Sequence, residues 1–468
     1  MTVDFKKEVE ARWDDLLADL QEVLKVPSVR DDSQATEDAP LGPGPRDALL
    51  KFLEIFERDG FKTTNVDNLA GYLEYGEGDE MLGIIGHVDV VPVGDGWDTD
   101  PFEPVIKDKR IYARGSSDDK GPTMAAYYGL KIIKELGLPV SKRVRVILGT
   151  DEETGWTGMN HYLEVEEVPD FGFSPDAEFP IINGEKGNMV MNIHTKGEND
   201  GAFQLIKFDA GLRPNMVPEN ATAVVTMPVD QQEAIAEAYA KFIEETPITG
   251  EVDFDDNVAT FKAHGKAAHG AKPEAGINAA TYLATFLNDY DFNGAAKDYL
   301  AITADLLQND PFAEKLGLRE HDENMGDLTM NVGIFHFNQE SDDNTINLNF
   351  RFPTGTDERI ANKVAEMVKP YNATVNLEPG THVPHYVPGD DPLVKTLLDV
   401  YHEHTGLPAH EQVIGGGTFG RLLERGVAFG AMFPDSIDTM HQANEFMDLD
   451  DLFRSAVIYA DAIYRLIK

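Results

Sequence analysis

Strands and helices alternate at both ends of this chain, and a different pattern separates the two stretches. Apolar runs at 81–91, 144–150 and 171–175 predict buried strands, and the segments between them have helical periodicity. The alternation returns after about residue 382. Strands that alternate with helices build a mostly parallel sheet with helices on both faces. We therefore predict one α/β domain formed by both ends of the chain.

The middle of the chain has longer alternating strands, such as VMNIHTKG, NATAVVTMP and TINLNFRFP, and more polar helices. This combination of strand and helix patterns predicts an α+β insertion. A chain of 468 residues is also longer than one typical core accommodates. We expect the α/β domain to comprise residues 1–186 and 382–468, and the inserted domain to comprise residues 187–381.

Composition excludes several classes of function. Lys and Arg total 40 against 83 Asp and Glu, and the net charge of -43 argues against nucleic acid and anionic membrane surfaces as partners. The absence of cysteine excludes disulfides, thiolate nucleophiles and cysteine metal ligands. The first residues, MTVDFKKEVEARWDDLL, are charged from the fourth position and show no apolar core of signal-peptide length, and no uncharged apolar run reaches about 18 residues. We expect a cytoplasmic protein.

Acidic side chains and one histidine follow predicted strands: His87 and Asp89 follow the first, Asp151, Glu152 and Glu153 the second, and Asp176 the third. A turn-rich stretch between the first two strands carries Asp118 and Asp119 just before a predicted helix. The carboxyl ends of parallel strands meet at one edge of a sheet, so these groups should converge there. Clustered carboxylates repel one another unless a cation neutralises them. Imidazole and carboxylate without thiolate favour Zn²⁺, with Mn²⁺ and Co²⁺ as alternatives.

Each of these signals also has an ordinary structural explanation. A single histidine near a strand end is commonly structural, and the acids of DEE (151–153) commonly form a solvated turn or helix start. Their occurrence at several successive strand ends favours a metal site. His87 and Asp89 are two residues apart on one strand face. The Asp89 carboxylate can then accept the second ring N–H of a metal-bound His87 and fix its tautomer.

Several motifs together resemble those of the two-metal exopeptidases and amidohydrolases, a family that includes aminoacylase, carboxypeptidase G and the carnosinases. The motifs are GHVDVVPVGDGW, RGSSDDKGP, GTDEETGW, SPDAEFP, GKAAHGAKPEAGINA, GGGTFGR and MHQANE. The resemblance covers essentially the whole chain and is strongest to the bacterial dipeptidase V group. It implies that the α/β domain is a catalytic metallopeptidase domain and that the insertion is a lid.

The resemblance implies a centre for two divalent ions. The implied metal ligands are His87, Asp118, Glu153, Asp176 and His441. Asp118 should bridge the ions, with His87 and Asp176 on one of them and Glu153 and His441 on the other. The peptide bond between Asp118 and Asp119 should be cis. The choice of Asp118 as the bridge follows the motif spacing, and Asp119 could be a surface acid or a helix cap.

The resemblance also implies the remaining site residues. Glu152 should be the general base for a metal-bridged hydroxide, Asp89 should assist His87, and His269 should stabilise the oxyanion. The residues that should hold the substrate carboxylate are Asn215, Arg351, Gly417 and Thr418. Arginine suits this task because its planar fork can bind a carboxylate through two bonds.

The resemblance implies a two-zinc dipeptidase that hydrolyses short peptides. It also implies a monomer, since dimeric members of the family have a much shorter insertion and take the oxyanion histidine from a partner chain. A related amidohydrolase acting on N-acyl or N-succinyl amino acids would use the same metal ligands. A non-catalytic cation-binding module is a third interpretation. Metal binding alone requires none of Glu152, His269 and Arg351, so the presence of all three disfavours that module.

Overall fold

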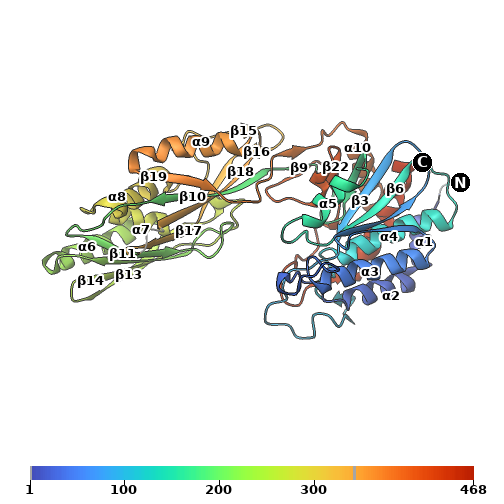
Figure 1. Cartoon of the computed structure of the whole chain (residues 1–468), viewed down its shortest axis with the longest axis horizontal. Helices are drawn as coiled ribbons and strands as arrows, with labels where there is room; N and C mark the ends of the chain where they lie inside the picture. The colour runs from blue at the N-terminus through green and yellow to red at the C-terminus, as the bar shows by residue number, and fades with distance from the viewer. Residues whose placement is uncertain (1–2, 341–343) are drawn as a thin grey trace. The chain divides into compact units, whose positions relative to one another are not determined.

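The computed structural model describes residues 3–340 and 344–468, which divide into two compact units (Figure 1). Unit 1 comprises Met1–Gly184 and Tyr386–Lys468, and unit 2 comprises Glu185–His385. Each unit contains its own cluster of buried apolar side chains. Within the described ranges, no helix is both long and apolar enough to cross a bilayer.

Unit 1 is built on a six-stranded sheet with the order β1-β2-β6-β3-β7-β22. The strands are β1 (Lys62–Val66), β2 (Ala70–Tyr75), β3 (Met81–His87), β6 (Arg143–Gly149), β7 (Phe171–Ser174) and β22 (Gly426–Ala428). β3 pairs in parallel with β6 and β7, and β22 pairs in parallel with β7. β2 pairs antiparallel with β1 and β6. The predicted α/β fold with a mostly parallel sheet is confirmed.

Helices cover both faces of this sheet. They are α1 (Phe5–Glu10), α2 (Trp13–Leu24), α3 (Pro43–Arg58), α4 (Lys120–Glu135), α5 (Thr157–Val165), α10 (Pro392–Thr405) and α11 (Leu449–Ile467). Alternate residues of β3 point to opposite faces, as the strand period of two requires. Ile84 belongs to the large apolar cluster that includes α2, α3, α4 and α11, whereas Ile85 packs with Met159 and Tyr162 of α5. Both faces of β3 are therefore buried against apolar side chains. Its one polar residue, His87, lies at its carboxyl end.

Unit 2 contains an eight-stranded sheet with the order β13-β14-β12-β11-β17-β18-β10-β19, in which neighbouring strands are antiparallel. The strands are β10 (Gly187–Thr195), β11 (Gln204–Ala210), β12 (Asn220–Thr226), β13 (Thr249–Asp255), β14 (Val258–His264), β17 (Thr329–Asn338), β18 (Asn344–Phe352) and β19 (Ala373–Leu377). Burial alternates along β10, so one face carries the core of this unit.

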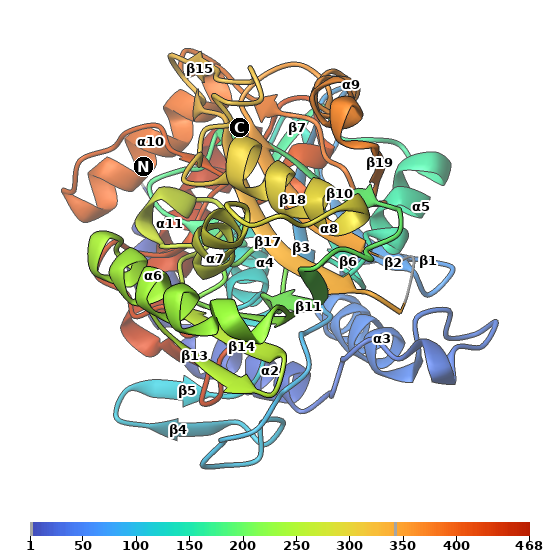
Figure 2. The same ribbon diagram turned by 90° about the vertical axis from the view of Figure 1, so that its left-hand side faces the viewer.

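The helices of unit 2 supply the other side of that core (Figure 2). They are α6 (Gln232–Glu245), α7 (Ala279–Leu287), α8 (Gly294–Ala301) and α9 (Asp357–Val368). Sheet and helices together form an α+β unit, as the alternating strands and polar helices of the sequence predict.

Candidate metal centre

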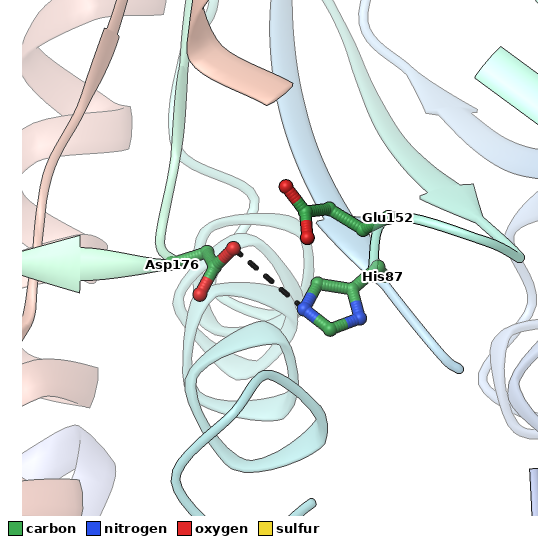
Figure 3. Close-up of side chains that lie close together, drawn as sticks. All are labelled: His87, Glu152 and Asp176. Carbon is green, nitrogen blue, oxygen red and sulfur yellow. Dashed lines mark ion pairs between the residues drawn. The ribbon is translucent and has the colours of Figure 1, made fainter. Parts of the chain in front are cut away.

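His87 is the last residue of β3 and is fully buried. Its Nε2 atom lies 3.0 Å from Asp118 Oδ1 and 3.6 Å from Asp176 Oδ2. Its Nδ1 atom lies 3.0 Å from the backbone oxygen of Asp89 and 3.3 Å from Asp89 Oδ1. Figure 3 shows the ring facing Asp176, which follows β7, with Glu152 beside both. Two parallel strands thus bring an imidazole and a carboxylate together at their carboxyl ends.

Asp118 lies between two imidazole rings. Its Oδ1 atom is 3.0 Å from His87 Nε2, and its Oδ2 atom is 2.9 Å from His441 Nε2. The same nitrogen of His441 is 3.1 Å from Glu153 Oε1. A carboxylate that bridges two cations needs one oxygen directed to each half of the site, and Asp118 has this arrangement.

Two overlapping groups of side chains have the spacing of metal ligands. Ligand atoms of His87, Glu152 and Asp176 lie within 4.8 Å of one another, and so do those of His87, Asp118 and Glu153. Sequence reasoning assigns Glu152 only a proton-transfer role, so its place in the first group is an addition from the structure.

The electrostatics of this cluster also fit cations. Burial, and then the neighbouring charge of Asp118, raise the pKa of both Glu153 and Asp176. Hydrogen bonds to Asp118 and Glu153 raise the pKa of His441 to about 11. These raised pKa values mean that the cluster favours added positive charge, here as bound protons. A pair of divalent cations would supply that charge and leave the carboxylates ionised.

Asp119 is fully buried, which excludes the surface position considered for it. Its Oδ2 atom accepts hydrogen bonds from the His87 backbone N–H at 3.1 Å and from the Thr123 hydroxyl at 2.8 Å. It is the N-cap residue of α4, but its side chain makes no capping bond. The Asp118–Asp119 peptide bond is cis, as the family resemblance implies. Asp119 thus holds the end of β3 against the start of α4.

Asp151 does not join the acidic cluster that the sequence predicts. Its carboxylate accepts hydrogen bonds from the backbone N–H groups of Thr157 at 2.7 Å and Gly158 at 2.9 Å. Arg30 Nη1 lies 3.1 Å from the same side chain. Asp151 therefore serves the start of α5, where an acid satisfies otherwise unpaired N–H groups.

Asp89 has a second set of contacts that sequence reasoning does not predict. Its Oδ1 and Oδ2 atoms accept hydrogen bonds from the backbone N–H groups of Glu152 at 3.0 Å and Glu153 at 3.2 Å. These bonds join residues more than sixty positions apart, and no local pattern indicates them. Asp89 consequently positions the DEE turn as well as the ring of His87.

Within unit 2, the predicted residues Asn215, His269 and Arg351 are brought together. Asn215 O accepts the N–H of Gly270 at 2.7 Å, and Met216 and His269 form an isolated bridge. Burial and the charge of Arg351 lower the pKa of His269, which keeps the imidazole neutral at neutral pH. A neutral imidazole can donate one hydrogen bond and accept another.

Gly417 and Thr418 lie in unit 1, just before the short 3₁₀ helix Phe419–Leu422. Gly417 is exposed, whereas Thr418 is buried and its hydroxyl accepts the N–H of Gly420 at 3.1 Å. The ring of Phe419 lies 6.4 Å from that of His87, measured between centroids. The predicted loop is thus adjacent to the metal-ligand cluster through Phe419.

The sequence profile of Peptidase family M20/M25/M40 matches residues 83–465, which contain every side chain of this cluster. The chain belongs to this family. A Beta-Ala-Xaa dipeptidase of Lactobacillus delbrueckii subsp. lactis is 45% identical over 475 residues, covering 100% of this chain and 99% of the relative. The resemblance seen in the motifs is thereby confirmed.

Two solved structures are similar in fold at low sequence identity. Aminoacylhistidine dipeptidase from Vibrio alginolyticus is 14% identical with a TM-score of 0.58, and the match covers 97% of this chain and 96% of that one. Human carnosine dipeptidase 1 is 14% identical with a TM-score of 0.57, covering 98% and 97%. Both matches include unit 1 and unit 2, so the two-unit architecture is shared.

Proposed function

We propose that this protein is a metal-dependent dipeptidase that hydrolyses the peptide bond of dipeptides. The observation that carries the proposal is the position of Asp118, with one oxygen 3.0 Å from His87 and the other 2.9 Å from His441. The 45% identical relative is a Beta-Ala-Xaa dipeptidase, which supports β-alanyl dipeptides as one substrate class.

The five metal ligands that we propose divide between two ions. His87 and Asp176 would hold one ion, Glu153 and His441 would hold the other, and Asp118 would contact both. Zn²⁺ is the proposed metal because the set contains imidazole and carboxylate, and Mn²⁺ or Co²⁺ would accept the same ligands. When bound, such a pair supplies Lewis-acid chemistry, since it lowers the pKa of water and polarises a carbonyl oxygen.

Glu152 is the proposed proton-transfer group. Its carboxylate lies beside the ligand atoms of His87 and Asp176, and burial raises its pKa well above the ordinary value. A carboxylate with a raised pKa can take a proton from the attacking water and then release it to the departing amine. One side chain thereby serves both halves of the hydrolysis.

The substrate contacts that we propose are those that the family resemblance implies. Arg351, Asn215, Gly417 and Thr418 would bind the free carboxylate of the dipeptide. His269 donates a hydrogen bond to the oxygen on which negative charge develops, where a fixed donor stabilises the transition state by about 3–4 kcal/mol. A neutral imidazole with a lowered pKa suits this donation.

We further propose that the enzyme is a cytoplasmic monomer. The ground for proposing a monomer is the large insertion, since the same chain contains Asn215, His269 and Arg351 within unit 2. A chain of 468 residues without cysteine suits a reducing compartment.

A substrate panel with a matched pair of variants tests the proposal. The zinc-loaded protein is assayed against β-Ala-X and Ala-X dipeptides and against N-acetyl and N-succinyl amino acids. Glu152→Gln should bind zinc normally and lose at least about a hundredfold in turnover. Glu164→Gln on the exposed side of α5 should match the parent. Preference for the N-acylated compounds, or near-normal turnover by Glu152→Gln, would reject the proposal.

A further inference from the structure

Arg114 and Glu445 form a buried ion pair beside the metal-ligand cluster. Arg114 Nη1 lies 2.7 Å from Glu445 Oε2, and each side chain is 1% exposed. The two residues come from distant parts of the sequence, and neither belongs to the metal-ligand groups. Burying a charged pair costs desolvation free energy unless further hydrogen bonds compensate it. The contacts around this pair therefore show which parts of the fold it connects.

Glu445 collects hydrogen bonds from the loop that leads into Asp118. Its Oε1 atom accepts the backbone N–H groups of Gly115 at 3.1 Å, Ser117 at 2.9 Å and Asp118 at 3.3 Å. The Ser117 hydroxyl donates to the same oxygen at 3.0 Å. One buried carboxylate therefore fixes the backbone at the residue whose side chain lies between His87 and His441.

Arg114 extends the connection to the loop after β3. Its Nη2 atom donates weakly to the backbone oxygens of Pro92 at 3.4 Å and Val93 at 3.3 Å. Its guanidinium carbon lies 5.2 Å from the centre of the Trp97 ring. The pair thus links the segment after His87 and Asp89 to the two segments that contain Asp118 and His441.

His441 depends on such anchors because it lies in an irregular loop. Its side chain is 53% exposed, and both His441 and Asn444 have left-handed backbone angles, with φ of 62° and 60°. Asn444 Oδ1 accepts the backbone N–H of Asp98 at 2.8 Å. Glu445 follows directly and is fully buried. The loop is therefore attached to the body of unit 1 immediately after the exposed histidine.

From these contacts we infer that Glu445 is a positioning residue that fixes Asp118 and His441 relative to each other. It acts through the backbone of residues 115–118 and through its own place four residues after His441. His87 and Asp176 are placed by β3 and β7 of the central sheet and need this anchor less. Loss of Glu445 should consequently affect the His441 half of the metal centre more strongly than the other half. The inference rests on the proposed metal binding, not on the identity of the substrate.

A buried ion pair that only stabilises the fold would behave differently, and Asp19 provides the matched control. Asp19 is also a buried carboxylate, with its two oxygens 2.7 Å from Arg58 Nη1 and Nη2 and one oxygen 2.6 Å from the Tyr128 hydroxyl. Asp19→Asn removes a comparable charge from α2. It should lower the melting temperature without changing zinc affinity.

The experiment compares full-length parent, Glu445→Gln and Asp19→Asn proteins. Zn²⁺ is titrated into each metal-free protein in competition with a chromophoric chelator, and amide hydrogen exchange is followed by mass spectrometry. For Glu445→Gln we expect one zinc equivalent to weaken by about 10–100-fold. The other equivalent should weaken at least tenfold less, and exchange at residues 115–118 should accelerate in the metal-free protein. Asp19→Asn should leave both zinc equivalents and this exchange unchanged.

Two results would overturn the inference. One is unchanged exchange at residues 115–118 in Glu445→Gln, and the other is equal weakening of both zinc equivalents. If Glu445→Gln does not fold, Glu445→Asp replaces it, because it keeps the charge and withdraws the oxygens by one methylene; parent-like zinc affinity and exchange in that variant overturn the inference. If the parent protein binds two zinc ions but cleaves no dipeptide, the proposed function is wrong. The zinc titrations and the hydrogen exchange would still test the role of Glu445 in that case.

Discussion

The carboxylate of Asp89 accepts the backbone N–H of Glu152 at 3.0 Å, and the same Oδ1 atom lies 3.3 Å from Nδ1 of His87. One buried acid therefore sets the orientation of a proposed metal ligand and the position of the proposed general base. Its effect on the reaction should exceed that of an ordinary buried hydrogen bond, because both partners belong to the proposed reaction site.

Asp89→Asn should lower kcat/KM by about 10–100-fold. Asparagine retains one oxygen and places an NH₂ group where the carboxylate accepts from the DEE turn, so one backbone N–H loses its acceptor. The measurement is steady-state kinetics on a dipeptide at saturating zinc. Asp79→Asn, at an exposed position, is the control. Parent-like kinetics in Asp89→Asn would show that the ring and turn are held by other contacts.

Removal of metal should destabilise unit 1. The clustered carboxylates of Asp118, Glu153 and Asp176 repel one another when no cation compensates them. A ligand at a hundred times its Kd stabilises the folded state by about 2.7 kcal/mol. Chelated protein should therefore melt several degrees below the zinc-loaded protein in calorimetry. Asp176→Asn should show a smaller difference, and an unchanged melting temperature on chelation would argue against metal binding in the folded state.

Asp59 should make unfolding pH-dependent far from neutral pH. Burial alone would raise its pKa, but hydrogen bonds from Arg58 and Lys131 outweigh burial and lower the pKa to about 2. The ordinary pKa is 3.8, so folding favours the ionised form. The resulting stability is present above about pH 4 and is lost as the pH falls from 3.8 towards 2.

Urea unfolding of the parent and Asp59→Asn at pH 6 and pH 3 measures this contribution. The variant should be less stable at pH 6 by about 1 kcal/mol, a value reduced for solvent screening of a partly exposed group. The difference should shrink at pH 3, because Asp59 is then largely protonated in the unfolded chain, so the folded state gains less from holding it ionised. A difference that is constant with pH would assign the effect to packing instead of charge.

Gly86→Ala should destabilise the protein and disturb the end of β3. A Cβ atom at Gly86 would lie 1.9 Å from Thr123 Oγ1 and 2.9 Å from Asp119 Oδ2. Overpacking of this kind costs about 1–3 kcal/mol. Gly416→Ala is the control, because its nearest neighbour would be the Ile414 Cδ1 atom at 3.7 Å. Equal free energies of unfolding for the two variants would contradict the crowding seen around Gly86.

Local sequence patterns predict the mostly parallel sheet and the residue types of the proposed metal centre. Apolar runs bounded by turn residues specify β3, β6 and β7, because burial on both faces requires continuous apolar strands. The acids and His87 at their ends follow from the same rule, since parallel strands share one edge for their carboxyl ends. These inferences depend on local patterns, which a sequence displays directly.

The different roles of neighbouring acids depend on contacts that form only in the folded chain. Asp151 and Glu152 are neighbours in one turn, yet Asp151 caps α5 while Glu152 lies beside His87 and Asp176. The choice depends on side-chain direction and on N–H groups supplied by α5. The contacts of Asp89 with the DEE turn and of Glu445 with residues 115–118 join segments far apart in the chain. No local periodicity encodes such pairings, because they exist only after the strands and loops have packed.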